Sequence, residues 1–92
     1  MQPIKWTEEA FLDLQRFYEF LLPFNAAAAS KTIQTLTSAP EKIGNNPRLG
    51  ERLLEFAPRE VRRLIVGHYE LRYEIRDNLI YILRIWHARE NR

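Results

Sequence analysis

The chain has 92 residues, of which 46% are hydrophobic and 28% are charged, a balance typical of one soluble globular domain with a modest core. It contains no cysteine and only two histidines, which excludes a disulfide framework, a thiolate zinc site and a cysteine nucleophile. No apolar run approaches the length of a membrane span, and the N-terminus lacks the hydrophobic region of a signal peptide. We therefore expect a cytoplasmic protein with a single domain over residues 1–92 and no metal, cofactor or membrane contact.

Charge is distributed unevenly along the chain. The formal net charge is only +2, but residues 1–47 carry −1 and residues 48–92 carry +3. All ten basic residues of the second segment are arginines. Because arginine presents a planar fork of donors suited to phosphate, carboxylate and aromatic faces, this skew is chemical as well as electrostatic.

The first half of the chain predicts two helices after a short extended segment at 4–6. Thr7 can cap the first helix, which Pro23 ends, and Asn25 can cap the second, with Pro40 marking its approximate end. The short link between them predicts an antiparallel helical hairpin. The apolar stripe expected for the first helix comprises Phe11, Leu14, Phe17, Tyr18, Leu21 and Leu22.

From Arg59 onward the sequence pattern changes to the two-residue period of β-strands. Strands are predicted over 61–66, 69–76 and 79–86, with turns at 67–68 and 77–78. They form a three-stranded antiparallel meander, to which segment 4–6 can add an edge strand. The expected fold is α+β, with an N-terminal strand and a helical hairpin packed on a three- to four-stranded antiparallel sheet.

Two-residue turns also allow the two faces of the sheet to be assigned. The face toward the helices is expected to carry Arg62, Leu64, Val66, Tyr69, Leu71, Tyr73, Ile75, Ile80, Ile82, Arg84 and Trp86. The opposite, open face is expected to carry Arg63, Ile65, Glu70, Arg72, Glu74, Arg76, Tyr81, Leu83 and His87.

The arginine-rich open face offers the best candidates for chemistry. Arg63 and Arg72, with His87 and Arg89 near the end of the last strand, could bind a nucleic-acid backbone or stabilise charge in a metal-free RNA cleavage. His87 could act as a general acid or base. The alternative is an ordinary solvated face on which alternating glutamates and arginines pair across strands, with His87 as a surface residue.

The last strand is apolar on both faces, which predicts that a partner covers its second side. A peptide laid across the sheet or along its edge would do so. Leu79, Tyr81 and Leu83 are the candidate contacts for such a partner.

An ordered set of short motifs runs through almost the whole chain. It comprises Trp6-Thr7, Ala10, Asp13-Leu14, Pro40, Pro47–Gly50, Glu60–Leu64, Gly67–Tyr69, Leu71–Tyr73, Ile80–His87 and Arg89. This set resembles the ParE/RelE superfamily of small bacterial toxins from type II toxin–antitoxin systems. The resemblance implies a cytoplasmic toxin that a cognate antitoxin wraps and inactivates, with Leu79, Tyr81 and Leu83 helping to receive it.

The superfamily includes RelE-like ribosome-dependent mRNA endonucleases and ParE-like toxins that act on DNA gyrase. Arg63 and Arg89 match basic positions of RelE-like nucleases, but Glu70 stands where an arginine is expected after Tyr69, and Arg72 lies two residues on. The C-terminal tyrosine of those nucleases is absent, and the ending Trp86–Glu90 is similar to the ParE type. We expect a ParE-like gyrase inhibitor; the alternatives are a RelE-like nuclease acting on ribosome-bound mRNA, and a family member with weak or lost toxicity. Whether the protein is an enzyme stays open.

Overall fold

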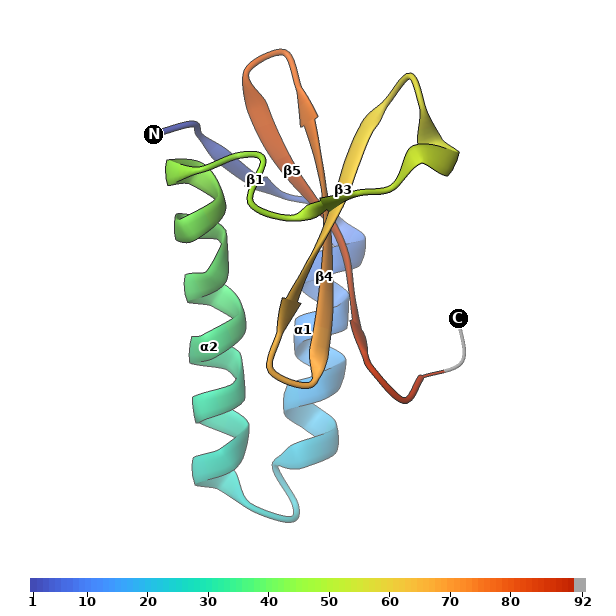
Figure 1. The fold of residues 1–92 in the computed structure, drawn as a ribbon. Helices are drawn as coiled ribbons and strands as arrows, with labels where there is room; N and C mark the ends of the chain where they lie inside the picture. Colours follow the sequence, from blue (N-terminus) through green and yellow to red (C-terminus); the bar gives the residue numbers. More distant parts are fainter. Residues whose placement is uncertain (91–92) are drawn as a thin grey trace.

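The computed structural model describes residues 1–90, which form a helical hairpin packed on one face of a sheet (Figure 1). In chain order the elements are β1 (Ile4–Trp6), α1 (Glu8–Leu21), α2 (Ala26–Asn45), β2 (Glu51–Arg52), the 3-10 helix η1 (Leu54–Phe56), β3 (Glu60–Val66), β4 (Tyr69–Arg76) and β5 (Leu79–His87). The strand order is β1-β5-β4-β3-β2. The α+β class, the antiparallel meander and the edge strand β1 are confirmed.

The sheet has five strands within residues 1–90, so the expected count of three to four is wrong. The additional strand is β2, whose two residues pair antiparallel with Arg62 and Arg63 of β3. Two residues are too few to show an alternating pattern, so this strand was not predicted. β1 pairs in parallel with residues 80–82 of β5, which brings the first and last strands side by side.

Both expected helix caps are present. The Thr7 side chain accepts a hydrogen bond from the Ala10 amide, and the Asn25 side chain accepts one from the Ala28 amide. The expected end of the second helix at Pro40 is wrong, because α2 continues through it to Asn45. Proline removes one helical hydrogen bond, but the turn that follows buries Ile43 completely, and this burial favours continuing the helix.

The buried face of α1 also differs from the expected stripe. Ala10, Leu14 and Phe17 are buried, whereas Phe11, Tyr18 and Leu22 are 59%, 36% and 41% exposed. The buried stripe includes a carboxylate, Asp13, and hydrophobic periodicity alone does not predict that a charged residue faces inward. The core between the helices and the sheet consists mainly of Leu36, Ile43, Leu71, Tyr73, Ile80, Ile82 and Ile85.

The expected turn pairings, Val66 with Tyr69 and Arg76 with Leu79, are confirmed. A β-bulge then shifts the register between β4 and β5, because Arg72 lies opposite Arg84 while Tyr73 lies opposite Ile82. Leu83 is the additional residue.

The bulge reverses the face of every later residue on β5. Ile85 pairs with Leu71 and is fully buried on the helical side. Trp86 pairs with Glu70 on the open face, and His87 pairs with Tyr69 on the helical side. The expected faces of Trp86 and His87 are therefore wrong, since they assumed unbroken alternation along the strand. Arg84 pairs with Arg72 of the open face, although its guanidinium reaches Asp13 of α1 as a contact with the helices.

Candidate functional site

Arg63 and Arg72 lie opposite each other on β3 and β4, and a buried carboxylate holds both of them. Glu70, which is 2% exposed, accepts a hydrogen bond from Arg72 Nη2 at 2.9 Å, and its other oxygen lies 3.7 Å from Arg63 Nη1. Arg63 also donates to Glu51 of β2 at 2.7 Å, and this hydrogen bond raises the pKa of its guanidinium. The two arginines thus form one cluster whose charge is partly neutralised from within.

Aromatic rings fix the guanidinium of Arg72. It lies 4.5 Å from the ring centre of Trp86 and 5.6 Å from that of Phe56, distances at which a cation and an aromatic face attract. Arg84 lies 5.2 Å from the same Trp86 ring. The sequence interpretation missed this cluster because it placed Trp86 on the sheet face toward the helices and assigned Phe56 to no element.

Arg84 is anchored to the first helix rather than free for a ligand. Its Nε and Nη2 donate to the two oxygens of Asp13 at 2.8 Å and 3.1 Å, and these hydrogen bonds raise the pKa of the guanidinium. The Ile85 amide, on the part of the β5 edge that no strand within residues 1–90 covers, donates to Asp13 as well, at 2.8 Å. Asp13 therefore fastens the second half of β5 to α1.

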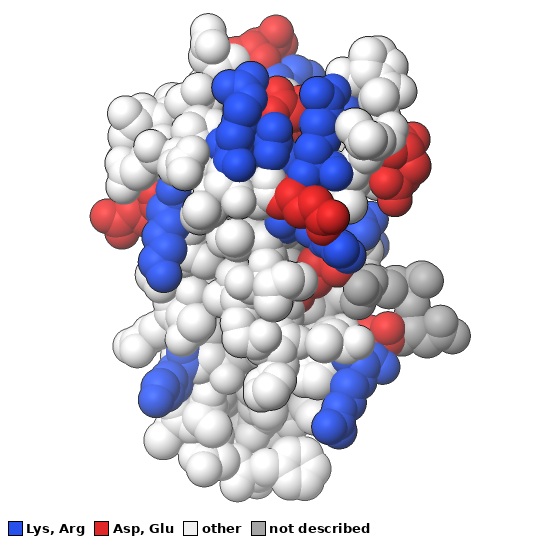
Figure 2. Space-filling model, viewed as in Figure 1, with Lys and Arg blue, Asp and Glu red and all other residues white. Residues whose placement is uncertain are grey.

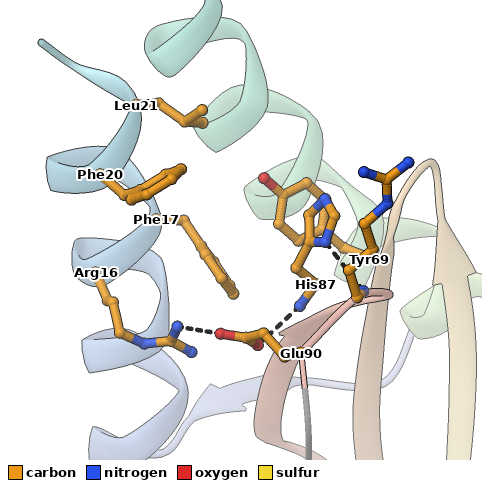
Figure 3. A pocket seen from close by; sticks show the side chains of 8 residues that line it. Arg16, Phe17, Phe20, Leu21, Tyr69, His87 and Glu90 are labelled. Atoms are coloured by element: carbon orange, nitrogen blue, oxygen red, sulfur yellow. Dashed lines mark hydrogen bonds and ion pairs between the residues drawn. The ribbon is translucent and has the colours of Figure 1, made fainter. Parts of the chain in front are cut away.

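His87 and Arg89 line a pocket of about 500 Å³ between the end of α1 and the C-terminal turn (Figure 3). The His87 ring stands edge-on to Tyr69, with ring centres 5.1 Å apart, and lies 6.2 Å from the ring of His68. The Arg89 amide donates to His87 Nδ1 at 3.1 Å, so this nitrogen acts as an acceptor. The complete lining is Arg16, Phe17, Phe20, Leu21, Tyr69, His87, Arg89 and Glu90.

Glu90 closes the C-terminal turn against α1. One carboxylate oxygen pairs with Arg16, and the other accepts a hydrogen bond from the His87 amide at 2.9 Å (Figure 3). Burial acts to raise the pKa of the Glu90 carboxyl, but these hydrogen bonds outweigh it and lower the pKa. Arg16 also lies 3.5 Å from Asp13, which links the turn to the anchor of β5.

The four candidate catalytic residues fall into two pairs. Arg63 and Arg72 meet on the open face, whereas His87 and Arg89 meet at the pocket on the helical side. The third candidate set, Leu79, Tyr81 and Leu83, lies half-buried along the first part of β5. There the Arg76 guanidinium covers the Tyr81 ring at 4.3 Å.

Two further classes of site are absent from the described chain. Residues 1–90 contain no group of three or more histidine, aspartate or glutamate side chains arranged to hold a metal ion. Over the same residues, no helix combines the length and the apolar character needed to cross a bilayer.

Comparison with known proteins gives consistent matches over nearly the whole chain. A family model described as the ParE toxin of the type II toxin–antitoxin system parDE matches residues 4–92. Toxin RelE2 from Caulobacter vibrioides is 32% identical over 88 residues, which cover 96% of this chain and 97% of the relative.

Two solved structures share the fold. The chromosomal ParDE system from P. aeruginosa aligns with a TM-score of 0.79 and 23% identity, covering 95% of this chain and 96% of the other. The toxin–antitoxin complex RelBE2 from Mycobacterium tuberculosis aligns with a TM-score of 0.60 and 24% identity, covering 94% and 96%.

Proposed function

Because this chain belongs to the ParE toxin family of type II toxin–antitoxin systems, we propose that it inhibits DNA gyrase and that a cognate antitoxin keeps it inactive in the cytoplasm. In this proposal the toxin acts by binding. His87 and Arg89, at the end of the last strand, contact the target. Leu79, Tyr81 and Leu83 receive the antitoxin.

The separation of the candidate catalytic residues argues against RNA cleavage and so favours a gyrase inhibitor that acts by binding. Metal-free RNA cleavage needs a proton-transfer group and cations around the same phosphate. Here His87 lies on the opposite face of the sheet from Arg63 and Arg72. Glu70 already binds both guanidiniums, so a phosphate would have to compete with a buried carboxylate. This arrangement supports inhibition by binding rather than by cleavage.

The half-buried state of Leu79, Tyr81 and Leu83 supports their role in antitoxin binding. They follow one another along β5, so an extended or helical segment laid on this strand would contact all three. Burying the remaining apolar surface of such residues contributes about 25 cal/mol for each square ångström removed from water.

A RelE-like nuclease that acts on ribosome-bound mRNA is the second candidate. One observation favours it: Arg63 and Arg72 converge on Glu70, Arg72 lies over the Trp86 ring, and the two arginine side chains remain 39% and 23% exposed. Cations beside an aromatic face suit a nucleic acid, since they can contact phosphate and base together. In this alternative the cluster contacts the mRNA and Glu70 positions the two arginines.

Two parallel assays separate the candidates. Purified protein is added to gyrase with supercoiled plasmid, and separately to translating ribosomes with a reporter mRNA. We expect trapped gyrase–DNA breaks and intact mRNA. Codon-phased mRNA cuts without gyrase inhibition would contradict the gyrase proposal and establish the nuclease.

A growth experiment tests the antitoxin. Induction of the chain alone should arrest growth, and co-expression of the protein encoded by the neighbouring reading frame should restore it. Normal growth on induction would support a member with weak toxicity. Arrest that the neighbouring product does not relieve would contradict the assignment of that product as the antitoxin.

A further inference from the structure

The two histidines of the chain meet at the end of the sheet that lies toward the tip of the helical hairpin (Figure 1). His68 lies in the turn between β3 and β4, and His87 is the last residue of β5. Their rings are nearly parallel, with an angle of 27° between the ring planes and 6.2 Å between the ring centres. Histidine is the side chain that ordinarily changes charge between about pH 5 and pH 8, so this pair places two such groups side by side.

Three hydrogen bonds fold the C-terminal turn, residues 88–90, back onto this pair. The Ala88 amide donates to the His68 carbonyl at 2.7 Å, and the Glu90 amide donates to the His87 carbonyl at 3.0 Å. The Arg89 amide donates to Nδ1 of the His87 ring at 3.1 Å. Of these three acceptors, only the ring nitrogen takes up a proton near neutral pH.

Protonation of the His87 ring removes this acceptor. In a neutral imidazole one nitrogen accepts and the other carries the proton, whereas in the imidazolium both nitrogens are donors. The Nδ1–H group would then face the Arg89 N–H, donor against donor, and the amide would lose its partner. A hydrogen bond of this kind favours the closed form of the turn by roughly twofold to tenfold.

Nearby cations also oppose a positive charge on His87. His68 gains its own charge over the same pH range, and Arg89 lines the same pocket as His87. Lys31 of α2 lines a second, smaller pocket together with His68. On the face that Figure 2 shows, other Lys and Arg side chains gather mainly at the end opposite the tip of the hairpin. Like-charge repulsion within this small group therefore adds to the loss of the hydrogen bond.

Glu90 is the acidic side chain that lines the pocket within residues 1–90, and its oxygens are already bound. One pairs with Arg16 of α1, which also lies 3.5 Å from Asp13, and the other accepts the His87 amide. Burial acts to raise the pKa of the Glu90 carboxyl, but these hydrogen bonds lower it below its ordinary value, so it stays charged while histidines titrate. Burial raises the pKa of Tyr69, whose ring the His87 ring meets edge-on, so this phenol stays neutral.

We propose that His87 is a pH-dependent latch for the C-terminal turn. In its neutral form it holds residues 88–90 as one wall of the pocket, and in its protonated form it releases them and opens the pocket beside α1. Release also weakens the contacts of Glu90 with Arg16 and with the His87 amide, because Glu90 belongs to the turn. The latch itself does not depend on the target. Its consequence rests on the proposed function, in which His87 and Arg89 contact gyrase, so that acid weakens inhibition.

Nuclear magnetic resonance relaxation of the purified chain tests the latch. The order parameter of a backbone amide is about 0.85 in rigid structure and below about 0.6 in flexible segments. We expect the Arg89 amide to lie near the first value at about pH 7.5 and to fall toward the second at about pH 5.5. The midpoint of the fall should follow the ring signals of His87, and the amides of β4 should not change.

Two substitutions separate the acceptor from the proton. His87→Asn keeps a side-chain oxygen that can accept the amide two residues on, as in an Asx turn, but does not titrate, so the turn should stay ordered at both pH values. His87→Phe keeps a ring without an acceptor, so the turn should be mobile at both. The matched control is His68→Gln, which removes the neighbouring charge and leaves the hydrogen bond, so the transition should remain. Circular dichroism confirms that each variant is folded.

An Arg89 amide that is equally ordered at both pH values in the wild type would overturn the latch. So would a loss of order in acid in His87→Asn, because another group would then control the turn, and so would an ordered turn in His87→Phe. Trapped gyrase–DNA breaks are counted in a separate assay at the same two pH values. The relaxation measurement does not involve gyrase, so failure of the gyrase proposal is seen separately.

Discussion

Asp13 on α1 holds Arg84 on β5 by a two-point ion pair, with donor–acceptor distances of 2.8 Å and 3.1 Å. The carboxylate is almost fully buried, at 4% exposure, and it also accepts the Ile85 amide. This amide lies on the β5 edge beyond the point where β1 ends. A helix side chain thus supplies the acceptor that a neighbouring strand would otherwise provide.

Replacing Asp13 with alanine should destabilise the fold. The Ile85 amide and the Arg84 guanidinium would lose their acceptor, and a buried unsatisfied donor costs about 1–3 kcal/mol. Arg84 is 42% exposed, so water compensates part of its loss, and we expect a total of about 2 kcal/mol. Urea unfolding measures the change. Glu19→Ala, on the exposed side of α1, is the control, and equal midpoints for the two variants would contradict the prediction.

Tyr73→Phe should also destabilise the fold, through the loop before β2. The buried hydroxyl donates to the Pro47 carbonyl at 2.8 Å and accepts the Gly50 amide at 2.9 Å. Without it the buried Gly50 amide has no acceptor, at a cost of about 1–3 kcal/mol. Thermal unfolding should show a lower midpoint than for Tyr18→Phe, whose side chain lies at the surface. A midpoint equal to that control would show that water replaces the hydroxyl.

Acid should remove the stabilising effect of Glu74. Two hydrogen bonds from Arg59, at 3.1 Å and 2.9 Å, lower the pKa of this carboxyl below its ordinary value of 4.5. Because the pKa is lower in the folded state, the stabilisation is complete above the ordinary value and is lost as the pH falls through the lowered one. The difference in unfolding free energy between the wild type and Glu74→Gln should therefore shrink from about pH 6 to about pH 3. A difference that stays constant over this range would contradict the ion-pair origin.

Arg89→Ala should weaken gyrase inhibition if the pocket end of the molecule contacts the target. Removing a charge from an interface lowers association and affinity, so we expect at least roughly fivefold fewer trapped gyrase–DNA breaks at equal concentration. Arg76→Ala is the control, because this arginine is also exposed but lies at the other end of β4. Equal loss in both variants would indicate a general effect of net charge rather than a contact.

The elements that the sequence predicted correctly are those with local signals. Thr7 and Asn25 cap helices through their own side chains, and the alternation in residues 69–76 defines β4 without reference to distant residues. The short turn at residues 67–68 fixes Val66 opposite Tyr69. The regular pairing that follows places Arg63 opposite Arg72, so the two side chains share one face of the sheet, as predicted.

The errors arise where a distant contact decides the outcome. β5 is apolar on both faces, so its pattern does not reveal the bulge at Leu83, and the positions of Trp86 and His87 follow from that bulge. The inward-facing Asp13 depends on Arg84, which lies 71 residues away in the chain. The candidate residues could therefore be chosen by type from the sequence, but their division into an open-face cluster and a pocket required the three-dimensional register.

The parallel pairing of β1 with β5 has a consequence for protein synthesis. β1 leaves the ribosome before the helices and the other strands of the sheet, and its partner β5 follows all of them. Until β5 emerges, β1 has no neighbour in the sheet, Asp13 lacks its two-point partner Arg84, and the pocket lacks its C-terminal wall. Contacts of such large sequence separation form late in folding. A nascent chain that lacks β5 therefore carries neither the finished sheet nor the surfaces proposed for the target and the antitoxin, so toxicity would begin only after β5 has emerged.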